Sequence, residues 1–234
     1  MPQQPVAIVT GASRGVGRAA AIELGRLGYR LTLVSRSESD LKETARLAGV
    51  EAIIAQADVT QSQEVDGLVT RTIDRFERID AVVNNAGDAP MLSIEATTPQ
   101  LWRRVIDTNL SAPFYLCRAC WPAFSEQKSG VVVNISSLAA RDPFPGLAAY
   151  GAAKAGLNLL GLALASEGAD IGVRVHTIAL GATETQMFRS LPGMSDFPRD
   201  RTLDPSDVAR MIGLCIRGEL AHTSGEVIWM HKGA

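Results

Sequence analysis

Short runs of β-branched and other apolar residues alternate with helix-period stretches along the whole sequence. Parallel strands cannot be joined by a tight turn, so each pair needs a crossover connection, usually a helix. The alternation therefore predicts an α/β fold, a doubly wound parallel β-sheet with helices on both faces. The expected strands cover 6–10, 30–35, 51–59, 79–87, 130–137, 173–180 and 226–230. The expected helices cover 17–28, 40–49, 62–76, 99–128, 148–168 and 204–216, and the long one is expected to break or bend from Asn109 to Pro113.

This pattern runs through the chain without a linker, low-complexity tract or short repeat, which predicts one domain over residues 1–234. Charged residues make up 21% of the chain and the net charge is −2, so neither a nucleic-acid partner nor a polybasic membrane surface is expected. No apolar run approaches the length of a membrane span, and the first residues do not read as a secretory signal. The expected location is the cytoplasm.

The cysteines Cys117, Cys120 and Cys215 are too few, and odd in number, for a disulfide framework. Cys117 and Cys120 form a C-x-x-C motif, which is typical of a redox pair when it opens a helix just after a strand. Here the motif lies inside a stretch expected to be helical, which favours two small buried residues instead. The three histidines show no ligand spacing with the cysteines, so no metal site is expected.

The first expected strand leads directly into the sequence TGASRGVG, residues 10–17. Glycines at Gly11, Gly15 and Gly17 permit a tight turn and a close approach of the backbone to a pyrophosphate. The helix that follows presents free N–H groups and the positive end of its dipole to such an anion. The loop favours dinucleotide binding, and the alternative is an ordinary tight turn between strand and helix.

Six motifs, in order and spacing, resemble the short-chain dehydrogenase/reductase family, whose members act with NAD(P). They are TGASRGVG at 10–17, Asp58-Val59, NNAG at 84–87, Asn109, VVNISS at 132–137, and Tyr150-x-x-x-Lys154. The resemblance implies a Rossmann-like fold and a catalytic set of Asn109, Ser137, Tyr150 and Lys154. In the family the asparagine holds a water that links the lysine to solvent, and the lysine also binds the nicotinamide ribose.

The resemblance further implies that Asp58 contacts the adenine, that Asn85 to Gly87 flank the cofactor, and that Thr185 faces the nicotinamide carboxamide. The full set of expected cofactor-binding residues is Gly11, Ser13, Arg14, Gly15, Val16, Gly17, Ser35, Arg36, Asp58, Val59, Asn85, Ala86, Gly87, Tyr150, Lys154, Gly181, Thr183 and Thr185.

The chemistry of carbonyl reduction also needs a pair such as Tyr150 and Lys154. Hydride transfer to a carbonyl produces an alkoxide that must be protonated, and a tyrosine hydroxyl can supply the proton. The ordinary pKa of tyrosine, about 10, is too high for efficient acid–base catalysis near neutrality. A lysine four residues away lies on the same helix face, and its charge is expected to lower the pKa of Tyr150.

Several of these polar residues have a structural alternative. Asn109 is also explained as a helix-break residue, and Ser136 and Ser137 as caps at a strand end. The family's spacing from the tyrosine selects Ser137 rather than Ser136. Asp58 is also explained as a helix cap, although neighbouring hydroxyl residues are available for that role.

The end of the second expected strand favours NADP(H) over NAD(H). An acidic residue there would bind the ribose 2′-hydroxyl of NAD, but this chain has Ser35 followed by Arg36. Arg14 lies in the glycine loop, and two guanidinium groups suit a 2′-phosphate. The alternative for each arginine is a solvated surface charge.

The chain departs from the family after the sixth strand and at its C-terminus. Leu180-Gly181 replaces the usual Pro-Gly, Thr183 stands where Ile or Val is common, and WMHKGA replaces the usual Asp-Gly-Gly ending. A substrate lid, short for the family, is expected at about 186–203. Its apolar contacts and its positive charges are expected from Met187, Phe188, Leu191, Met194 and Phe197, and from Arg189, Arg199 and Arg201.

These features predict an NADP(H)-dependent oxidoreductase that reversibly reduces a small-molecule ketone or aldehyde, with 3-oxoacyl compounds among the candidate substrates. The alternatives are a non-catalytic NADP-binding sensor or scaffold, and an epimerase or dehydratase of the same fold. The intact catalytic set argues against the sensor. The stretch 155–165 is apolar nearly all round and the strand 226–230 offers a second apolar edge, which predicts a homo-oligomer, a tetramer or otherwise a dimer.

Overall fold

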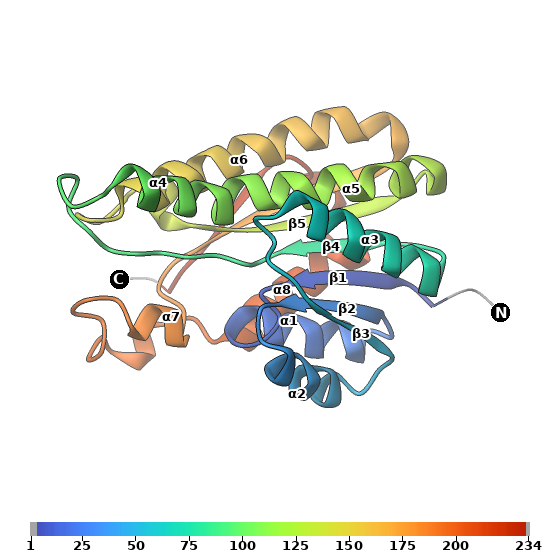
Figure 1. The fold of residues 1–234 in the computed structure, drawn as a ribbon, viewed down its shortest axis with the longest axis horizontal. Coiled ribbons are helices and arrows are strands. Elements are labelled where there is room, and N and C mark those ends of the chain that lie inside the picture. The colour runs from blue at the N-terminus through green and yellow to red at the C-terminus, as the bar shows by residue number, and fades with distance from the viewer. Residues whose placement is uncertain (1–3, 233–234) are drawn as a thin grey trace.

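The computed structural model describes residues 4–232, which form a seven-stranded sheet at the centre of the molecule (Figure 1). The strands are β1 (Val6–Thr10), β2 (Arg30–Ser35), β3 (Ala52–Gln56), β4 (Ala81–Asn84), β5 (Gly130–Ser137), β6 (Val173–Leu180) and β7 (Val227–Met230). They pair in the order β3-β2-β1-β4-β5-β6-β7, and every pairing is parallel. The predicted doubly wound α/β sheet is therefore confirmed.

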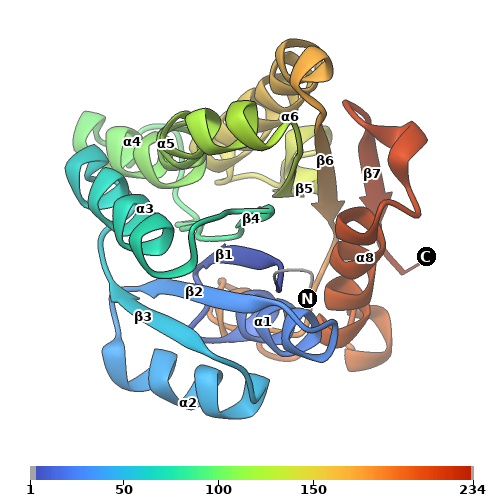
Figure 2. The same cartoon turned by 90° about the vertical axis from the view of Figure 1, so that its right-hand side faces the viewer.

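Helices cover both faces of this sheet, as Figure 2 shows. One layer contains α1 (Gly15–Arg26), α2 (Glu38–Ala48) and α8 (Pro205–Arg217), and the other contains α3 (Ser62–Phe76), α4 (Pro99–Ile106), α5 (Ala112–Gln127) and α6 (Ala148–Gly168). Successive strand residues point to opposite layers: Val9 and Leu33 lie in one hydrophobic core, and Ile8 and Val34 lie in the other. Burial on both faces explains why these strands are continuous apolar runs.

The expected strand at 79–87 is longer than the real one. β4 ends at Asn84, because the next backbone N–H groups, of Asn85 and Ala86, bond to the side-chain hydroxyl of Thr10 rather than to a strand. The third expected strand likewise ends early, at Gln56. Both differences free polar residues at the carboxyl end of the sheet.

The long helix is continuous rather than broken. α4 runs through a π-helical segment, Asp107–Ser111, directly into α5. Proline has no N–H, so Pro113 cannot donate to the carbonyl of Asn109 four residues earlier. The wider π turn accommodates this missing bond, and such turns are frequent at functional sites. The expected irregularity is present, but it is a bulge and not a break.

The helical stretch Ala148–Ile171 has the length and mean hydropathy, 1.2, of a membrane-spanning helix, a test that core helices of folded proteins also pass. In the structure it packs along β5 and β6, with Leu157, Gly161 and Leu164 buried. Leu159 and Leu162 lie on its outer side, 67% and 54% exposed. The apolarity of this helix therefore serves the core on one side and leaves an apolar stripe on the other.

The chain leaves the sheet after β6 and returns to the same place. Thr183 and Leu203 form a parallel bridge, and between them lie the short helix α7 (Gln186–Arg189) and a 3₁₀ turn at Arg199–Arg201 (Figure 1). This excursion contains the expected lid at 186–203. Residues 1–3 and 233–234, which the one-domain prediction and the comparison of the C-terminal sequence also include, lie outside the described residues.

Candidate active site

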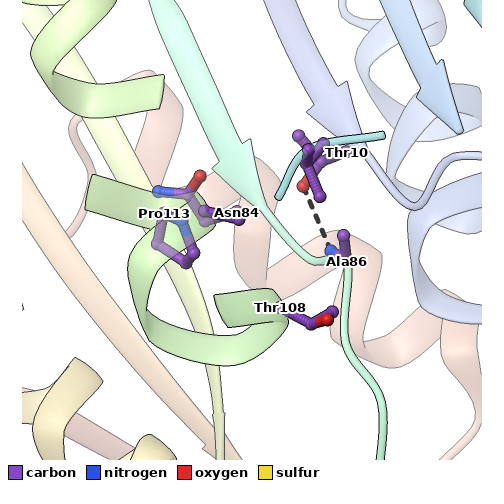
Figure 3. Close-up of a pocket in the computed structure, with 7 residues that line it drawn as sticks. Thr10, Asn84, Ala86, Thr108 and Pro113 are labelled. Atoms are coloured by element: carbon purple, nitrogen blue, oxygen red, sulfur yellow. Dashed lines mark hydrogen bonds between the residues drawn. The ribbon is translucent and has the colours of Figure 1, made fainter. Parts of the chain in front are cut away.

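The candidate site lies at the carboxyl ends of the strands, where the strand order reverses. β1 has β2 on one side and β4 on the other, and ligands bind open α/β sheets at such a switch point. Figure 3 shows a narrow pocket at this edge, lined by Thr10, Val59, Asn84, Ala86, Thr108, Ala112 and Pro113. The start of the glycine loop, the NNAG segment and the π-helical segment therefore meet at one place.

The glycine loop needs its glycines for two reasons. Gly11 and Gly15 have φ values of 63° and 54°, in the left-handed region that favours glycine. A Cβ atom on Gly17 would lie 2.2 Å from the carbonyl oxygen of Gly11 and 2.5 Å from Nδ2 of Asn85. Among the described residues, no side chain caps the first turn of α1, so its N–H groups are left for a ligand. This arrangement fits a phosphate group.

Asn85 ties the NNAG segment to the glycine loop. Its Nδ2 donates to the carbonyl oxygens of Thr10 and Gly11, at 2.9 and 3.2 Å. In return, the Thr10 hydroxyl accepts from the backbone N–H groups of Asn85 and Ala86, at 3.0 and 3.1 Å. Figure 3 shows the bond to Ala86. The side chain of Asn85 is therefore used within the protein. Sequence reasoning missed Thr10, and its place at the start of the glycine motif was the one available signal.

The residues expected to select the cofactor lie in two places. Ser35 ends β2, and its hydroxyl accepts from the backbone N–H of Ser37 at 3.1 Å. Arg36 follows it and is exposed. Arg14 is also exposed, but its guanidinium donates to Oε1 of Gln186, at 2.7 Å, in the lid. The structure thus places Arg36 at the end of β2 and Arg14 between the glycine loop and the lid.

Asp58 closes the turn between β3 and α3. Its Oδ1 accepts from the backbone N–H and the hydroxyl of Thr60, at 3.0 and 2.8 Å. α3 begins at Ser62 and its N-cap is Gln61, so the alternative that Asp58 caps this helix is wrong. Val59 lines the pocket of Figure 3, which places the Asp58-Val59 motif at the edge of the site.

Tyr150 and Ser137 come together although they lie on different elements, and the Ser137 side chain lowers the pKa of the phenol by hydrogen bonding. Ser137 ends β5 and Tyr150 lies in the first turn of α6. The Ser137 oxygen also accepts from the backbone N–H of Ala139, at 3.1 Å. Ser136 is buried, and its hydroxyl donates to the carbonyl oxygen of Lys154 at 3.4 Å. Of the two neighbouring serines, the structure brings Ser137 to the phenol.

Burial controls the charge of Tyr150 and Lys154. It raises the pKa of Tyr150 to about 12, and the hydrogen bond with Ser137 offsets only part of the rise. Burial also lowers the pKa of Lys154 to about 7. The Lys154 Nζ donates to the carbonyl oxygen of Ile135 at 2.8 Å and lies 5.6 Å from the centre of the Tyr150 ring. The prediction that Lys154 lowers the pKa of Tyr150 is therefore wrong for this structure.

Asn109 lies in the π-helical segment and is fully buried. Its Nδ2 donates to the carbonyl oxygens of Asp88 and Val105, at 2.8 and 2.9 Å. Gly87 lies beside it: a Cβ atom there would be 3.0 Å from Oδ1 of Asn109 and 3.9 Å from Nζ of Lys154. The bulge therefore holds Asn109 close to Lys154, and both side chains lie beside Gly87 at the end of the NNAG segment.

The segment after β6 lies against the glycine loop. The Thr183 hydroxyl donates to the carbonyl oxygen of Gly181 at 3.0 Å and is buried. The Thr185 hydroxyl accepts from the backbone N–H of Phe188 at 3.2 Å and so caps α7. A Cβ atom on Gly15 would lie 3.2 Å from the methyl carbon of Thr185. Thr185 thus reaches the loop that the glycines shape.

The lid differs from its prediction at one of its three arginines, Arg189, whereas Arg199 and Arg201 are exposed as expected. Phe188 and Phe197 form an edge-to-face pair with ring centres 5.4 Å apart, and Met187 is exposed, so apolar surface is present as expected. Arg189, however, forms an ion pair with Glu184. Its charge is neutralised within the lid rather than offered to a substrate.

The cysteines are free and buried. Burial raises the pKa of the Cys117 thiol to about 12 and that of Cys120 well above its ordinary value. Both lie inside α5, which agrees with the interpretation as small buried residues rather than a redox pair. Within residues 4–232, no three His, Cys, Asp or Glu side chains gather as a metal site would require.

Comparison with known proteins identifies the family. The family model described as short chain dehydrogenase matches residues 5–195, most of the chain. The chain belongs to the short-chain dehydrogenase family. A 3-oxoacyl-[acyl-carrier-protein] reductase of Synechocystis sp. is 39% identical to this short-chain dehydrogenase over 215 residues, which cover 88% of this chain and 87% of the relative. A reductase of the same name from Staphylococcus epidermidis is 30% identical over 237 residues, 97% of each chain.

The fold of this short-chain dehydrogenase is also close to a solved structure. The crystal structure of levodione reductase matches it with a TM-score of 0.90 and 26% identity, over 98% of this chain and 96% of that one. This short-chain dehydrogenase is therefore an oxidoreductase, and its family binds a nicotinamide cofactor. The uncapped first turn of α1 and the glycine loop fit the phosphates of such a cofactor.

Proposed function

We propose that this chain is an NADPH-dependent carbonyl reductase that reversibly converts a ketone or aldehyde into an alcohol. The observation that carries the proposal is the convergence of four polar side chains at one end of the sheet. Ser137 lies beside Tyr150, and Asn109 Oδ1 and Lys154 Nζ both lie next to the position that a Cβ atom of Gly87 would take. Side chains from β5, α6 and the π-helical segment meet there, as acid–base catalysis requires.

Tyr150 is the proton donor in this proposal. A bound nicotinamide supplies the hydride that adds to the carbonyl carbon. The Tyr150 hydroxyl gives its proton to the carbonyl oxygen, so no free alkoxide accumulates. Burial keeps the phenol protonated at neutral pH, so Tyr150 holds the proton that the reducing direction consumes, although a pKa of about 12 makes it a weaker acid than an ordinary tyrosine. Ser137, which lies beside Tyr150, orients the carbonyl oxygen.

In this scheme, Lys154 and Asn109 return a proton from solvent to the Tyr150 hydroxyl after each turnover. A pKa of about 7 allows Lys154 to give and accept a proton readily at neutral pH. Asn109 holds the water that connects Lys154 to solvent. Lys154 also binds the ribose, for which its ammonium has N–H donors besides the one that bonds to the carbonyl oxygen of Ile135.

NADPH is the proposed cofactor because the end of β2 has no carboxylate. Ser35 and the exposed Arg36 would receive the ribose 2′-phosphate. Arg14 would join them by exchanging its bond to Gln186 for one to the phosphate. The remaining contacts are assigned to the glycine loop at 11–17, Asp58-Val59, the segment 85–87, and Gly181, Thr183 and Thr185.

The relatives named 3-oxoacyl-[acyl-carrier-protein] reductase support a 3-oxoacyl compound as the first substrate to try. The proposal further includes a single domain with a lid at 186–203, a cytoplasmic location and a homo-oligomer, a tetramer or otherwise a dimer. The exposed apolar stripe of α6 supports the assembly.

The direct test is a screen of ketones, aldehydes and 3-oxoacyl thioesters with NADPH and NADH, followed at the nicotinamide absorbance. Tyr150→Phe should reduce turnover by about 10²–10⁴-fold or more, while NADPH binding, measured by fluorescence titration, changes little. Ser136→Ala is the matched control, because its hydroxyl bonds to a backbone carbonyl away from the phenol. Near-normal turnover by Tyr150→Phe would contradict the mechanism, and NADPH binding with no turnover of any carbonyl would favour a sensor.

A further inference from the structure

Arg189 is the last residue of α7. Its guanidinium donates to acceptors that precede the helix in the sequence and to others that follow it. Nε and Nη2 donate to the two carboxylate oxygens of Glu184, at 3.0 and 2.5 Å. Nη1 donates to the backbone carbonyl oxygens of Met194, Ser195 and Phe197, at 3.0, 3.1 and 2.6 Å. One side chain thus joins the residue before Thr185 to the loop after α7. We call Arg189, Glu184 and these three carbonyl groups the lid clasp.

The lid clasp is partly shielded from water. The side chains of Arg189 and Glu184 are 19% and 27% exposed. The forked hydrogen bond to Arg189 holds the pKa of Glu184 below its usual range, and the Thr202 hydroxyl donates to the same carboxylate at 3.2 Å. A two-point pair of this kind fixes geometry as well as charge, unlike a single-point surface pair.

The clasp fixes the residues that dock the lid on the glycine loop. Thr185 directly follows Glu184, and its methyl group lies against Gly15. Gln186 comes next and accepts a hydrogen bond from Arg14. Displacing the ends of α7 would therefore move both contacts between the lid and the loop.

We propose that Arg189 is a positioning residue that acts through the lid clasp, setting Thr185 and the apolar lid side chains in place before cofactor and substrate bind. The inference rests on the proposed function, in which Thr185 faces the nicotinamide carboxamide. It replaces the expectation that Arg189 attracts a substrate by its charge, because Glu184 and the three carbonyl groups already engage its Nε, Nη1 and Nη2.

A lid that is ordered in advance loses little conformational freedom when its ligands bind. Loosening the clasp should therefore weaken binding more than it slows the chemical step. Loss of Tyr150 should do the reverse, because the phenol acts on the reacting oxygen.

The test compares Arg189→Met, Arg189→Lys and Glu184→Gln with the control Arg217→Met. Arg217 forms an exposed ion pair with Glu219 at the far end of α8. The readouts are kcat and KM for a carbonyl found in the screen, the NADPH Kd from fluorescence, and cleavage by chymotrypsin. Cleavage is scored only after Phe188, Leu191 and Phe197, which stay unchanged in every variant, and cuts after the methionine that Arg189→Met introduces are excluded by mapping the fragment masses.

Arg189→Met and Glu184→Gln should raise KM and the NADPH Kd by about tenfold, the loss expected for a hydrogen bond between charged groups. The change in kcat should be smaller, and chymotrypsin should cut within 188–197 faster. Arg189→Lys should fall between these variants and the wild type, because lysine keeps the charge but not the fork. Arg217→Met should match the wild type.

Wild-type cleavage and wild-type NADPH Kd in both Arg189→Met and Glu184→Gln would overturn the proposal. A lower Tm in both variants with unchanged KM and Kd would overturn it as well, since it would reveal a role in stability alone. Cleavage and NADPH binding need no turnover. A failure of the carbonyl screen would therefore count against the proposed function and leave the clasp testable.

Discussion

Tyr150 and Lys154 lie one helical turn apart, and the protein around them excludes water from both. Tyrosinate and ammonium each lose hydration there, so each group is shifted toward its neutral form. The Lys154 ammonium donates to a neutral carbonyl of Ile135 rather than to a carboxylate, which leaves its charge uncompensated. The free enzyme therefore sacrifices stability to keep a lysine at this place.

This loss of stability should make the free energy of unfolding depend on pH. The pKa of Lys154 is about 7 in the folded protein and 10.5 as its ordinary value. Between these values the unfolded chain binds the extra proton, so the wild type becomes more stable as pH rises. Lys154→Met should therefore be more stable than the wild type at low pH. The difference between their free energies of unfolding should be largest below pH 7 and fall by about 1 kcal/mol per pH unit up to pH 10.

Urea unfolding at pH 6 to 10 measures this difference. Lys42→Met is the control, because Lys42 lies exposed on α2 beside Glu38. The control difference should stay flat over this range. A flat difference for Lys154→Met as well would show that the buried lysine carries no such penalty.

Cofactor choice should depend on the charge at the end of β2. Ser35→Asp combined with Arg36→Ala should change the preference from NADPH toward NADH, because a carboxylate repels the 2′-phosphate and accepts from a 2′-hydroxyl. The measurement is kcat/KM with each cofactor, and Arg36→Ala alone separates loss of the cation from gain of the acid. An unchanged ratio in the double variant would place the selectivity elsewhere.

At the scale of elements, α1 packs against the glycine loop and against Asn85, which follows β4, and these contacts leave no room for a side chain at Gly17. Gly17→Ala would put a Cβ atom 2.2 Å from the Gly11 carbonyl oxygen and 2.5 Å from Asn85. We expect it to reduce the free energy of unfolding by about 1–3 kcal/mol and to abolish NADPH binding.

Gly67→Ala is its matched control, because Gly67 also lies in a helix, α3, and has open space around its Cβ position. This change should stabilise the protein by about 0.5–1 kcal/mol, since alanine is the better helix former. Thermal or urea unfolding and a fluorescence titration give both numbers. Equal effects of the two substitutions would contradict the close approach of α1 to Gly11 and Asn85.

The elements were predictable because burial determines where apolar residues occur: strands buried on both faces are continuous apolar runs, and helices have apolar residues at helical spacing. The four-residue spacing of Tyr150 and Lys154 likewise placed both on one face of α6. The spacing of residues in the sequence did not predict the hydrogen-bond partner of each polar side chain. Lys154 turns to the Ile135 carbonyl and Arg189 to Glu184 because the fold brings these partners within reach. Pro113 indicated an irregular helix, but a π turn and a break have the same sequence signal.

At the scale of the whole molecule, two surfaces of the sheet and its helices remain apolar. The outer side of α6 presents Leu159 and Leu162, three residues apart and therefore on one face. β7 is the last strand of the sheet and is only partly buried. An isologous contact through each surface would generate two axes, and so a tetramer.

Sedimentation at micromolar concentration should therefore give about two or four times the single-chain mass of 24.9 kDa. Leu159→Arg combined with Leu162→Arg should lower the observed mass, because charges at an interface core are costly to bury. Leu47→Arg, at a leucine of α2 that is 41% exposed, is the control and should leave it unchanged. A wild-type mass of one chain would reject the assembly.

The bridge between Thr183 and Leu203 has a consequence for how such an enzyme diverges. Both ends of the excursion meet at this one point of the framework, where the backbone N–H of Leu203 bonds to the Ala182 carbonyl and that of Glu184 to the Leu203 carbonyl. Doubling the length of a loop whose ends are already held together costs only about 0.6 kcal/mol. Insertions and deletions between the two anchors can therefore accumulate over evolution, or be grafted from a relative, without disturbing the sheet. The architecture separates the proposed reaction centre from an interchangeable segment, the proposed substrate lid.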